Sequence, residues 1–197
     1  VDNPVKAREA ADLLRSEDVE IVFLYVSTYA LSSTVLPIAQ RIRVPVVILN
    51  LQPVPQLDYE AFNSMSDRGE MTGVWLEHCQ ACSVPEIASV FNRSGISYDF
   101  VSGYLHDEVA WTEIRAWTEA SRVSKALRNM RMGILGHYYN GMLDVYTDLT
   151  KQSAVFGTHF ELLEMCELKK LRDQVSQTEI QSKTEEFNEA FDVSPDC

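Results

Sequence analysis

Apolar residues in the first fifty positions gather into two short runs separated by an amphipathic stretch. Residues 19–26 (VEIVFLYV) and 44–50 (VPVVILN) are almost continuously apolar, which is typical of strands covered on both faces. Residues 32–41 between them predict a helix, in which Pro37 is tolerated only near the first turn. A strand, a helix and a strand in such close succession form a βαβ unit, so we expect the two strands to be parallel.

The segments around this unit predict further helices and one more strand. Asn3 and Pro4 suit the N-cap and the first position of a helix, whose expected apolar stripe is Val5, Ala10, Leu13 and Leu14. Residues 51–71 contain two prolines and predict a long loop of the kind that forms a lid. The predicted elements that follow are helices over 72–82 and 84–93, broken near Ser83-Val84-Pro85, a strand over 96–103 and a helix over 107–130.

The same rhythm starts again after residue 130. Residues 131–141 predict a strand followed by glycines, 142–155 a helix and 159–165 another strand. The last segment is polar and helical, with the capping-box spacing at Ser176 and Glu179. We therefore predict an α/β fold: an open parallel sheet with flanking helices, flavodoxin/Rossmann-like, over residues 1–130, followed by the start of a second, central α/β domain over 131–197.

Both ends of the chain have the pattern of an interrupted domain. The chain opens on a helix, where a sheet of this kind normally opens on a strand, and it closes on VSPDC, which is typical of a connection. We therefore expect a piece of a longer chain that lacks the first strand of its first domain.

Composition and charge exclude several classes of protein. With 197 residues, 46% of them hydrophobic, the chain can bury a sizeable core. A net charge of -12 disfavours binding to nucleic acid. No apolar run reaches the roughly 18–20 residues that cross a bilayer, and no secretion signal opens the chain, so we expect no membrane association and a cytoplasmic location.

Familiar catalytic and metal motifs are missing. Cys79 and Cys82 have the spacing of a metal or redox pair, but no second pair follows, and the pattern places them inside or at the end of a helix. His137 is the best placed histidine, after the strand at 131, yet an ordinary surface or hydrogen-bonded role is the favoured interpretation. The nucleophile elbow, the dinucleotide glycine motif and the phosphate-binding lysine loop do not occur. We assign no catalytic residue and no metal ligand.

The informative signal is the polarity of three predicted strand ends. They are Ser27-Thr28-Tyr29, Asn50-Leu51-Gln52 and His137-Tyr138-Tyr139-Asn140. In open parallel sheets, ligands bind at the carboxyl ends of the strands. Uncharged hydroxyls, amides and aromatic rings suit a neutral polyol such as a sugar. The alternative is that Ser32 or Ser33 caps a helix and that the other residues are ordinary loop.

Three blocks of sequence resemble the L-arabinose isomerase family, within the L-fucose/L-arabinose isomerase fold. They are TYALSSTVLPIAQRIRVPVVILNLQP, DYEAFNSMSDRGEMTG and GHYYNGMLDVYTDLTKQSAVFGTHFELLE, in the family's order and at similar intervals. The resemblance implies an aldose-ketose isomerase that uses a divalent metal, usually Mn²⁺, held by two glutamates and two histidines. None of those four ligands matches a residue here, so the resemblance implies that this chain alone binds no metal and is inactive.

The resemblance also implies binding positions and an assembly. Thr28 and Tyr29 fall at a strand end near the sugar, Gln52 matches a strand-end glutamine, and Met142 matches a methionine of the central domain. Asp67 and Arg68 fall where the family has a histidine that reaches the neighbouring subunit's site. The absence of that histidine puts the particular sugar in doubt. The family forms trimers or hexamers, so we expect a homo-oligomer.

Two other interpretations stay open. The chain could be a non-catalytic sugar-binding or regulatory α/β module, which needs only the polar strand ends and a lid. It could also be an assembly domain whose loops and tail build an oligomer.

Overall fold

The structure is a computed structural model that describes residues 1–136 and 138–194. It divides into two compact units, one of residues 1–125 and one that begins at residue 126. The predicted domain boundary near residue 130 stays a prediction. His137 lies outside the described residues.

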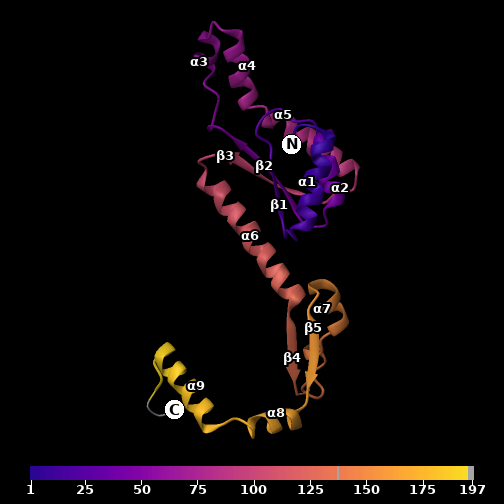
Figure 1. Cartoon of the computed structure of the whole chain (residues 1–197), viewed down its shortest axis with the longest axis vertical. Helices are drawn as coiled ribbons and strands as arrows, with labels where there is room; N and C mark the ends of the chain where they lie inside the picture. The colour runs from indigo at the N-terminus through magenta and orange to yellow at the C-terminus, as the bar shows by residue number, and fades with distance from the viewer. Residues whose placement is uncertain (137, 195–197) are drawn as a thin grey trace. The chain divides into compact units, whose positions relative to one another are not determined.

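The first unit is built on a three-stranded sheet (Figure 1). Its strands are β1 (Val22–Tyr25), β2 (Val46–Gln52) and β3 (Asp99–Tyr104), in the order β1-β2-β3. β1 and β3 both pair in parallel with β2. The connection from β1 to β2 contains a short 3-10 turn, η1 (Ser32–Thr34), and α2 (Leu36–Arg41). The predicted βαβ unit and the α/β fold class are therefore confirmed.

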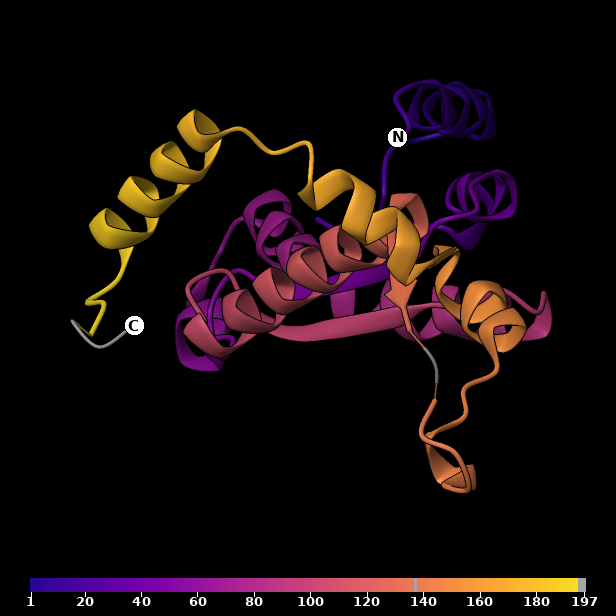
Figure 2. The ribbon, with the colours of Figure 1, turned by 90° about the horizontal axis from the view of Figure 1, so that it is seen from below.

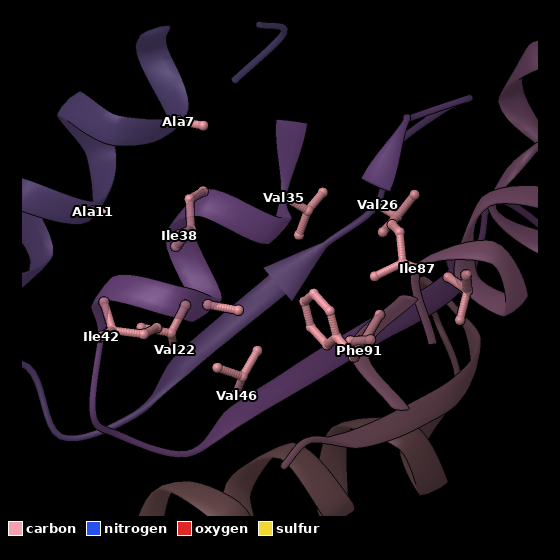
Figure 3. Close-up of a cluster of buried hydrophobic side chains, with 13 residues drawn as sticks. Ala7, Ala11, Val22, Val26, Val35, Ile38, Ile42, Val46, Ile87 and Phe91 are labelled. Atoms are coloured by element: carbon pink, nitrogen blue, oxygen red, sulfur yellow. The ribbon is translucent and has the colours of Figure 1, made fainter. Parts of the chain in front are cut away.

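Helices bury apolar residues on both faces of this sheet. On one face, α1 (Pro4–Ser16), α2 and α5 (Gln80–Arg93) pack over Val22, Val46 and Ile48, and Figure 3 shows Ile38, Ile42 and Phe91 among the side chains that meet there. On the other face, Ala110 and Ile114 of α6 (Glu108–Asn129) pack against Val47, Leu49, Leu51 and Val101. Alternate residues of β2 thus serve two separate clusters, as expected of a strand covered on both sides.

The first helix buries only part of the predicted stripe, because Ala10 and Leu14 pack against the core and Val5 and Leu13 do not. The side chain of Asn3 accepts hydrogen bonds from the backbone N–H groups of Val5 and Lys6, so the predicted start is confirmed. Ala7 and Ala11 are fully buried, whereas Val5 and Leu13 are 55% and 59% exposed. Each of these two exposed residues is two positions from a buried alanine, which is about 200° around a helix. The small alanines let α1 lie close to α2.

The prediction of a long loop over residues 51–71 is wrong. β2 continues to Gln52, and the segment then forms α3 (Tyr59–Ser64) and the start of α4 (Arg68–Glu77), beyond the carboxyl end of β2 in Figure 1. Each helix begins after an aspartate, Asp58 or Asp67, whose carboxylate accepts hydrogen bonds from two backbone N–H groups. These caps satisfy donors that a helix otherwise leaves unpaired.

The helix break also lies earlier than predicted. α4 ends at Glu77 and α5 begins at Gln80, and Pro85 lies inside α5. A proline there removes one hydrogen bond, to the carbonyl of Ala81. Ala81 is exposed, so water can hydrate that carbonyl and α5 continues.

The second unit contains a parallel pair of strands, as predicted. β4 (Arg131–Leu135) pairs with β5 (His159–Leu163). The helix predicted from residue 142 is shorter: η2 (Leu143–Val145) comes first, and α7 (Leu149–Phe156) starts after the Asp148 cap. α8 (Met165–Arg172) and α9 (Gln177–Ala190) are separate helices joined by a short connection (Figure 2). The predicted capping box at Ser176 and Glu179 is confirmed.

Within residues 1–136 and 138–194, no helix is long and apolar enough to cross a membrane.

Candidate functional site

The carboxyl edge of the sheet in the first unit carries uncharged polar side chains. β1 leads into Thr28 and Tyr29, and β2 ends at Gln52. Because β1 and β2 are adjacent and parallel, their carboxyl ends meet at one edge. Tyr29 is 55% exposed and makes no hydrogen bond with any described residue.

The register between β2 and β3 places four polar residues side by side. Asn50 lies opposite Ser102, and Gln52 lies opposite Tyr104. The Nδ2 group of Asn50 donates to Oγ of Ser102 at 3.1 Å, and Nε2 of Gln52 is 3.4 Å from Oδ1 of Asn50. We call Asn50, Gln52, Ser102 and Tyr104 the polar ladder.

The polar ladder occupies one face of the sheet. Side chains alternate between faces along a strand, so Asn50 and Gln52 share the face of Ile48, which α5 covers. Ser102 is exposed and the other three members are half-buried. The ladder offers amide and hydroxyl groups that both donate and accept hydrogen bonds. Ser102 and Tyr104 were not among the sequence-predicted site residues, because only the register brings them beside β2.

The segment that follows β1 is held by the junction between α4 and α5. The hydroxyl of Thr28 donates to the carbonyl of Leu76 at 3.0 Å. Nε2 of Gln80 donates to the carbonyl of Ser27 at 3.2 Å, and Oγ of Ser83 accepts from the N–H of Ala30 at 2.8 Å. The proton of the Thr28 hydroxyl is therefore engaged within the protein, and only its oxygen lone pairs remain for a ligand.

The expectation that Ser32 or Ser33 caps a helix is wrong. Leu31 precedes η1 and Val35 precedes α2, and neither position has a side-chain cap. Ser32 instead meets the carboxylate of Glu86 in α5, donating from its backbone N–H at 3.0 Å and from its hydroxyl at 2.6 Å. The carboxylate reaches both donors because α5 packs against this turn, a tertiary contact that local sequence does not report.

Asp67 and Arg68 lie at the start of α4. The carboxylate of Asp67 caps that helix, which is a structural role. Arg68 borders a surface cavity of about 370 Å³ that Phe62 and Trp75 also line. Within the described parts of the chain, no hydrogen bond joins Asp67 or Arg68 to Tyr29 or Gln52. Their part in sugar binding stays a prediction.

Met142 belongs to the second unit, where it is 45% exposed just before η2. Its part in sugar binding stays a prediction. The second unit has its own cavity of about 480 Å³ at the carboxyl ends of β4 and β5, lined by apolar side chains and by Tyr138, Thr147 and Glu164.

The residues described here do not assemble a metal centre. Among them, no group of three or more His, Cys, Asp or Glu side chains is placed to hold an ion. They do not supply the ligand set that a bound Mn²⁺ would need.

Cys79 immediately precedes α5 and Cys82 lies inside its first turn, so the prediction that the pair ends the preceding helix is wrong. α4 ends at Glu77, two positions before Cys79, and α5 begins at the residue after Cys79. The pair follows a helix and not a strand.

These features define an α/β protein whose parallel sheet presents neutral hydrogen-bonding groups at its carboxyl edge. No protein-family model matches the chain. Over 109 residues, or 55% of its length, the chain is 25% identical to the L-arabinose isomerase of Nocardioides sp. (strain ATCC BAA-499 / JS614). The matched segment spans 22% of that protein.

Proposed function

We propose that this chain is part of an aldose-ketose isomerase related to L-arabinose isomerase. We further propose that its own task is to bind the hydroxyl groups of the sugar. The observation that carries the proposal is the polar ladder at the carboxyl edge of a parallel sheet, where such folds bind ligands. The similarity to the Nocardioides isomerase supports a sugar as the ligand.

The chemistry of the polar ladder suits binding and orientation. Moving a proton between adjacent sugar carbons requires a general base and an electrophile at the carbonyl oxygen. The amides of Asn50 and Gln52 are neutral and do not abstract a proton from carbon. They can donate to and accept from sugar hydroxyls, while the ring of Tyr104 offers an apolar surface to the sugar's C–H groups.

The reactive groups therefore come, in this proposal, from segments outside this chain. A divalent ion such as Mn²⁺ would polarise the substrate carbonyl there as a Lewis acid. The chain by itself would bind sugar without turnover. The resemblance further leads us to propose a cytoplasmic homo-oligomer, a trimer or hexamer, in which Asp67 and Arg68 approach a neighbouring subunit.

Sugar binding to the full chain tests the proposal. Isothermal titration with L-arabinose should show saturable binding, and the Gln52→Ala variant should bind about tenfold more weakly, because it loses about one or two hydrogen bonds of roughly 1 kcal/mol each. Gln56→Ala removes an exposed glutamine a few residues further on and serves as the matched control. Equal affinities for the two variants would contradict the proposed site.

A second comparison separates the isomerase from a binding module. The chain should show no turnover of L-arabinose with Mn²⁺, whereas a protein extended by the flanking coding sequence should convert it. A similar response of the isolated chain to many unrelated polyols would favour the non-catalytic module instead.

A further inference from the structure

Cys79 and Cys82 lie on either side of the first turn of α5. The carbonyl of Cys79 accepts hydrogen bonds from the N–H groups of Cys82 and Ser83, both at 3.0 Å. Residues three positions apart on a helix are neighbours, with their Cβ atoms about 5–6 Å apart. A disulfide needs Cβ atoms about 3.5–4.5 Å apart, so closing the bridge requires the two residues to move together by about 1–2 Å.

The two thiols differ in accessibility. Cys79 is 4% exposed, whereas Cys82 is exposed to solvent. Burial raises the pKa of the Cys79 thiol, and neighbouring Cys82 raises that pKa further. A small oxidant can therefore reach Cys82, while Cys79 is protected from solvent and is adjacent to Cys82. Dithiol pairs that form reversible disulfides combine an outer attacking thiol with an inner resolving thiol in this way.

The pair also lies in a junction with incomplete hydrogen bonding. Nε2 of His78 and Oε1 of Gln80 are buried and have no protein partner within the described residues. Unsatisfied buried polar atoms lower the local stability. Leu76, Gln80 and Ser83 of this junction hold the segment Ser27–Ala30. A covalent link between Cys79 and Cys82 would close the turn at the centre of these contacts.

We propose that Cys79 and Cys82 are a redox modification site, at which the two cysteines form a reversible disulfide with each other. The oxidant is a low-molecular-weight disulfide such as oxidised glutathione. The Cys82 thiolate attacks one sulfur of the oxidant, which forms a mixed disulfide and releases one thiol. The Cys79 sulfur then attacks Cys82 in the mixed disulfide, loses its proton and expels the second thiol. Two protein thiols are oxidised and one disulfide is reduced to two thiols. This inference concerns a site that the proposed sugar binding does not use.

Mass spectrometry of the full chain tests the site directly. Trypsin releases the peptide Gly69–Arg93, which contains Cys79 and Cys82 and no other cysteine. The chain is equilibrated with mixtures of reduced and oxidised glutathione, quenched with acid, alkylated and digested. In oxidising mixtures the peptide should lack two hydrogens and resist alkylation, and excess reduced glutathione should restore two alkylatable thiols.

Variants show which cysteines form the bridge. Cys82→Ser replaces an exposed side chain and should abolish the bridge while the far-UV circular dichroism stays unchanged. The Cys166→Ser, Cys197→Ser double variant removes the remaining cysteines and should leave the bridge intact. The proposal is overturned if peptide 69–93 of the unaltered chain stays fully alkylatable at every ratio. It is equally overturned if that peptide carries only a glutathione adduct, or if the double variant loses the bridge.

Discussion

The hydroxyl oxygen of Ser83 in α5 accepts a 2.8 Å hydrogen bond from the backbone N–H of Ala30, 53 residues earlier in the chain. Ser83 is 1% exposed, so water does not readily replace it. We expect Ser83→Ala to lower the free energy of unfolding of the first unit by about 1–3 kcal/mol, because it leaves the Ala30 N–H without its acceptor. Urea unfolding followed by tryptophan fluorescence measures the change, since all three tryptophans, Trp75, Trp111 and Trp117, lie in this unit.

The matched control is Ser89→Ala in the same helix. Ser89 is exposed and makes no hydrogen bond through its side chain with any described residue. Its replacement should change the free energy of unfolding by less than about 0.5 kcal/mol. If the two variants unfold at the same urea concentration, the Ser83–Ala30 hydrogen bond does not stabilise this unit.

Phe91 anchors α5 in the core of the first unit. Its side chain is fully buried, and its ring meets that of Tyr98 edge to face, with 5.5 Å between the ring centroids. Phe91→Ala should lower the free energy of unfolding by about 3–5 kcal/mol, because it opens a cavity among the apolar side chains. Phe100→Ala, at a phenylalanine that is 54% exposed, is the control and should cost much less. If chemical denaturation shows that both variants lose the same free energy of unfolding, α5 does not pack as described.

Gly157 ends α7 in a backbone conformation that favours glycine. Its φ is +76°, and a Cβ there would lie 2.8 Å from Cγ and 3.2 Å from Cα of Arg128. Gly157→Ala should therefore destabilise the second unit by more than about 1 kcal/mol. Amide hydrogen exchange in α7 and β5 measures the loss.

Gly73→Ala provides a control with the opposite sign. Gly73 lies inside α4, and a Cβ there would meet nothing within 4 Å. Alanine favours the helix by up to about 1 kcal/mol over glycine, so this variant should slow amide exchange in α4. Faster exchange in α4 would contradict the described environment of Gly73.

The capping box of α9 predicts an acid-sensitive helix start. Hydrogen bonds from the backbone and side chain of Ser176 hold the pKa of the Glu179 carboxyl below its ordinary value of 4.5. A carboxyl whose pKa is lowered on folding stabilises the folded form above the unfolded-state pKa, and that contribution disappears as the pH falls through the folded-state pKa. The amide signals of Ser176 and Glu179 in NMR spectra should therefore shift as the pH is lowered below about 4.5.

Two substitutions check that assignment. Glu179→Ala should remove this acid transition at the start of α9. Glu189→Gln changes an exposed glutamate of the same helix whose side chain makes no hydrogen bond with any described residue, and it should leave the transition in place. If the acid transition survives in Glu179→Ala, a group other than Glu179 causes it.

Local signals in the sequence were sufficient for several elements. The N-cap at Asn3 and the capping box at Ser176 depend on residues two or three positions apart, so they can be recognised without the fold. The parallel pairing of β1 with β2 follows from the short βαβ succession. The aspartate caps at Asp58 and Asp67 were equally local, but the nearby prolines led to a loop prediction.

The candidate site was predictable only in part. Gln52 could be placed at a strand end because β2 is a clear apolar run. Ser102 and Tyr104 could not be placed beside it, because a shift of one residue in register would have turned both to the other face. The role of Thr28 depends on Leu76, 48 residues away, and the role of Ser32 depends on Glu86, 54 residues away.

The sequence by itself determined the class of fold and the neutral polar character of the strand ends, since both follow from hydrophobic periodicity and residue type. The tertiary structure decided which of those polar groups already bond within the protein, which lie side by side on the sheet, and which cysteine is buried. These outcomes depend on strand register and helix packing between residues distant in the chain, and no local pattern of side chains specifies such contacts.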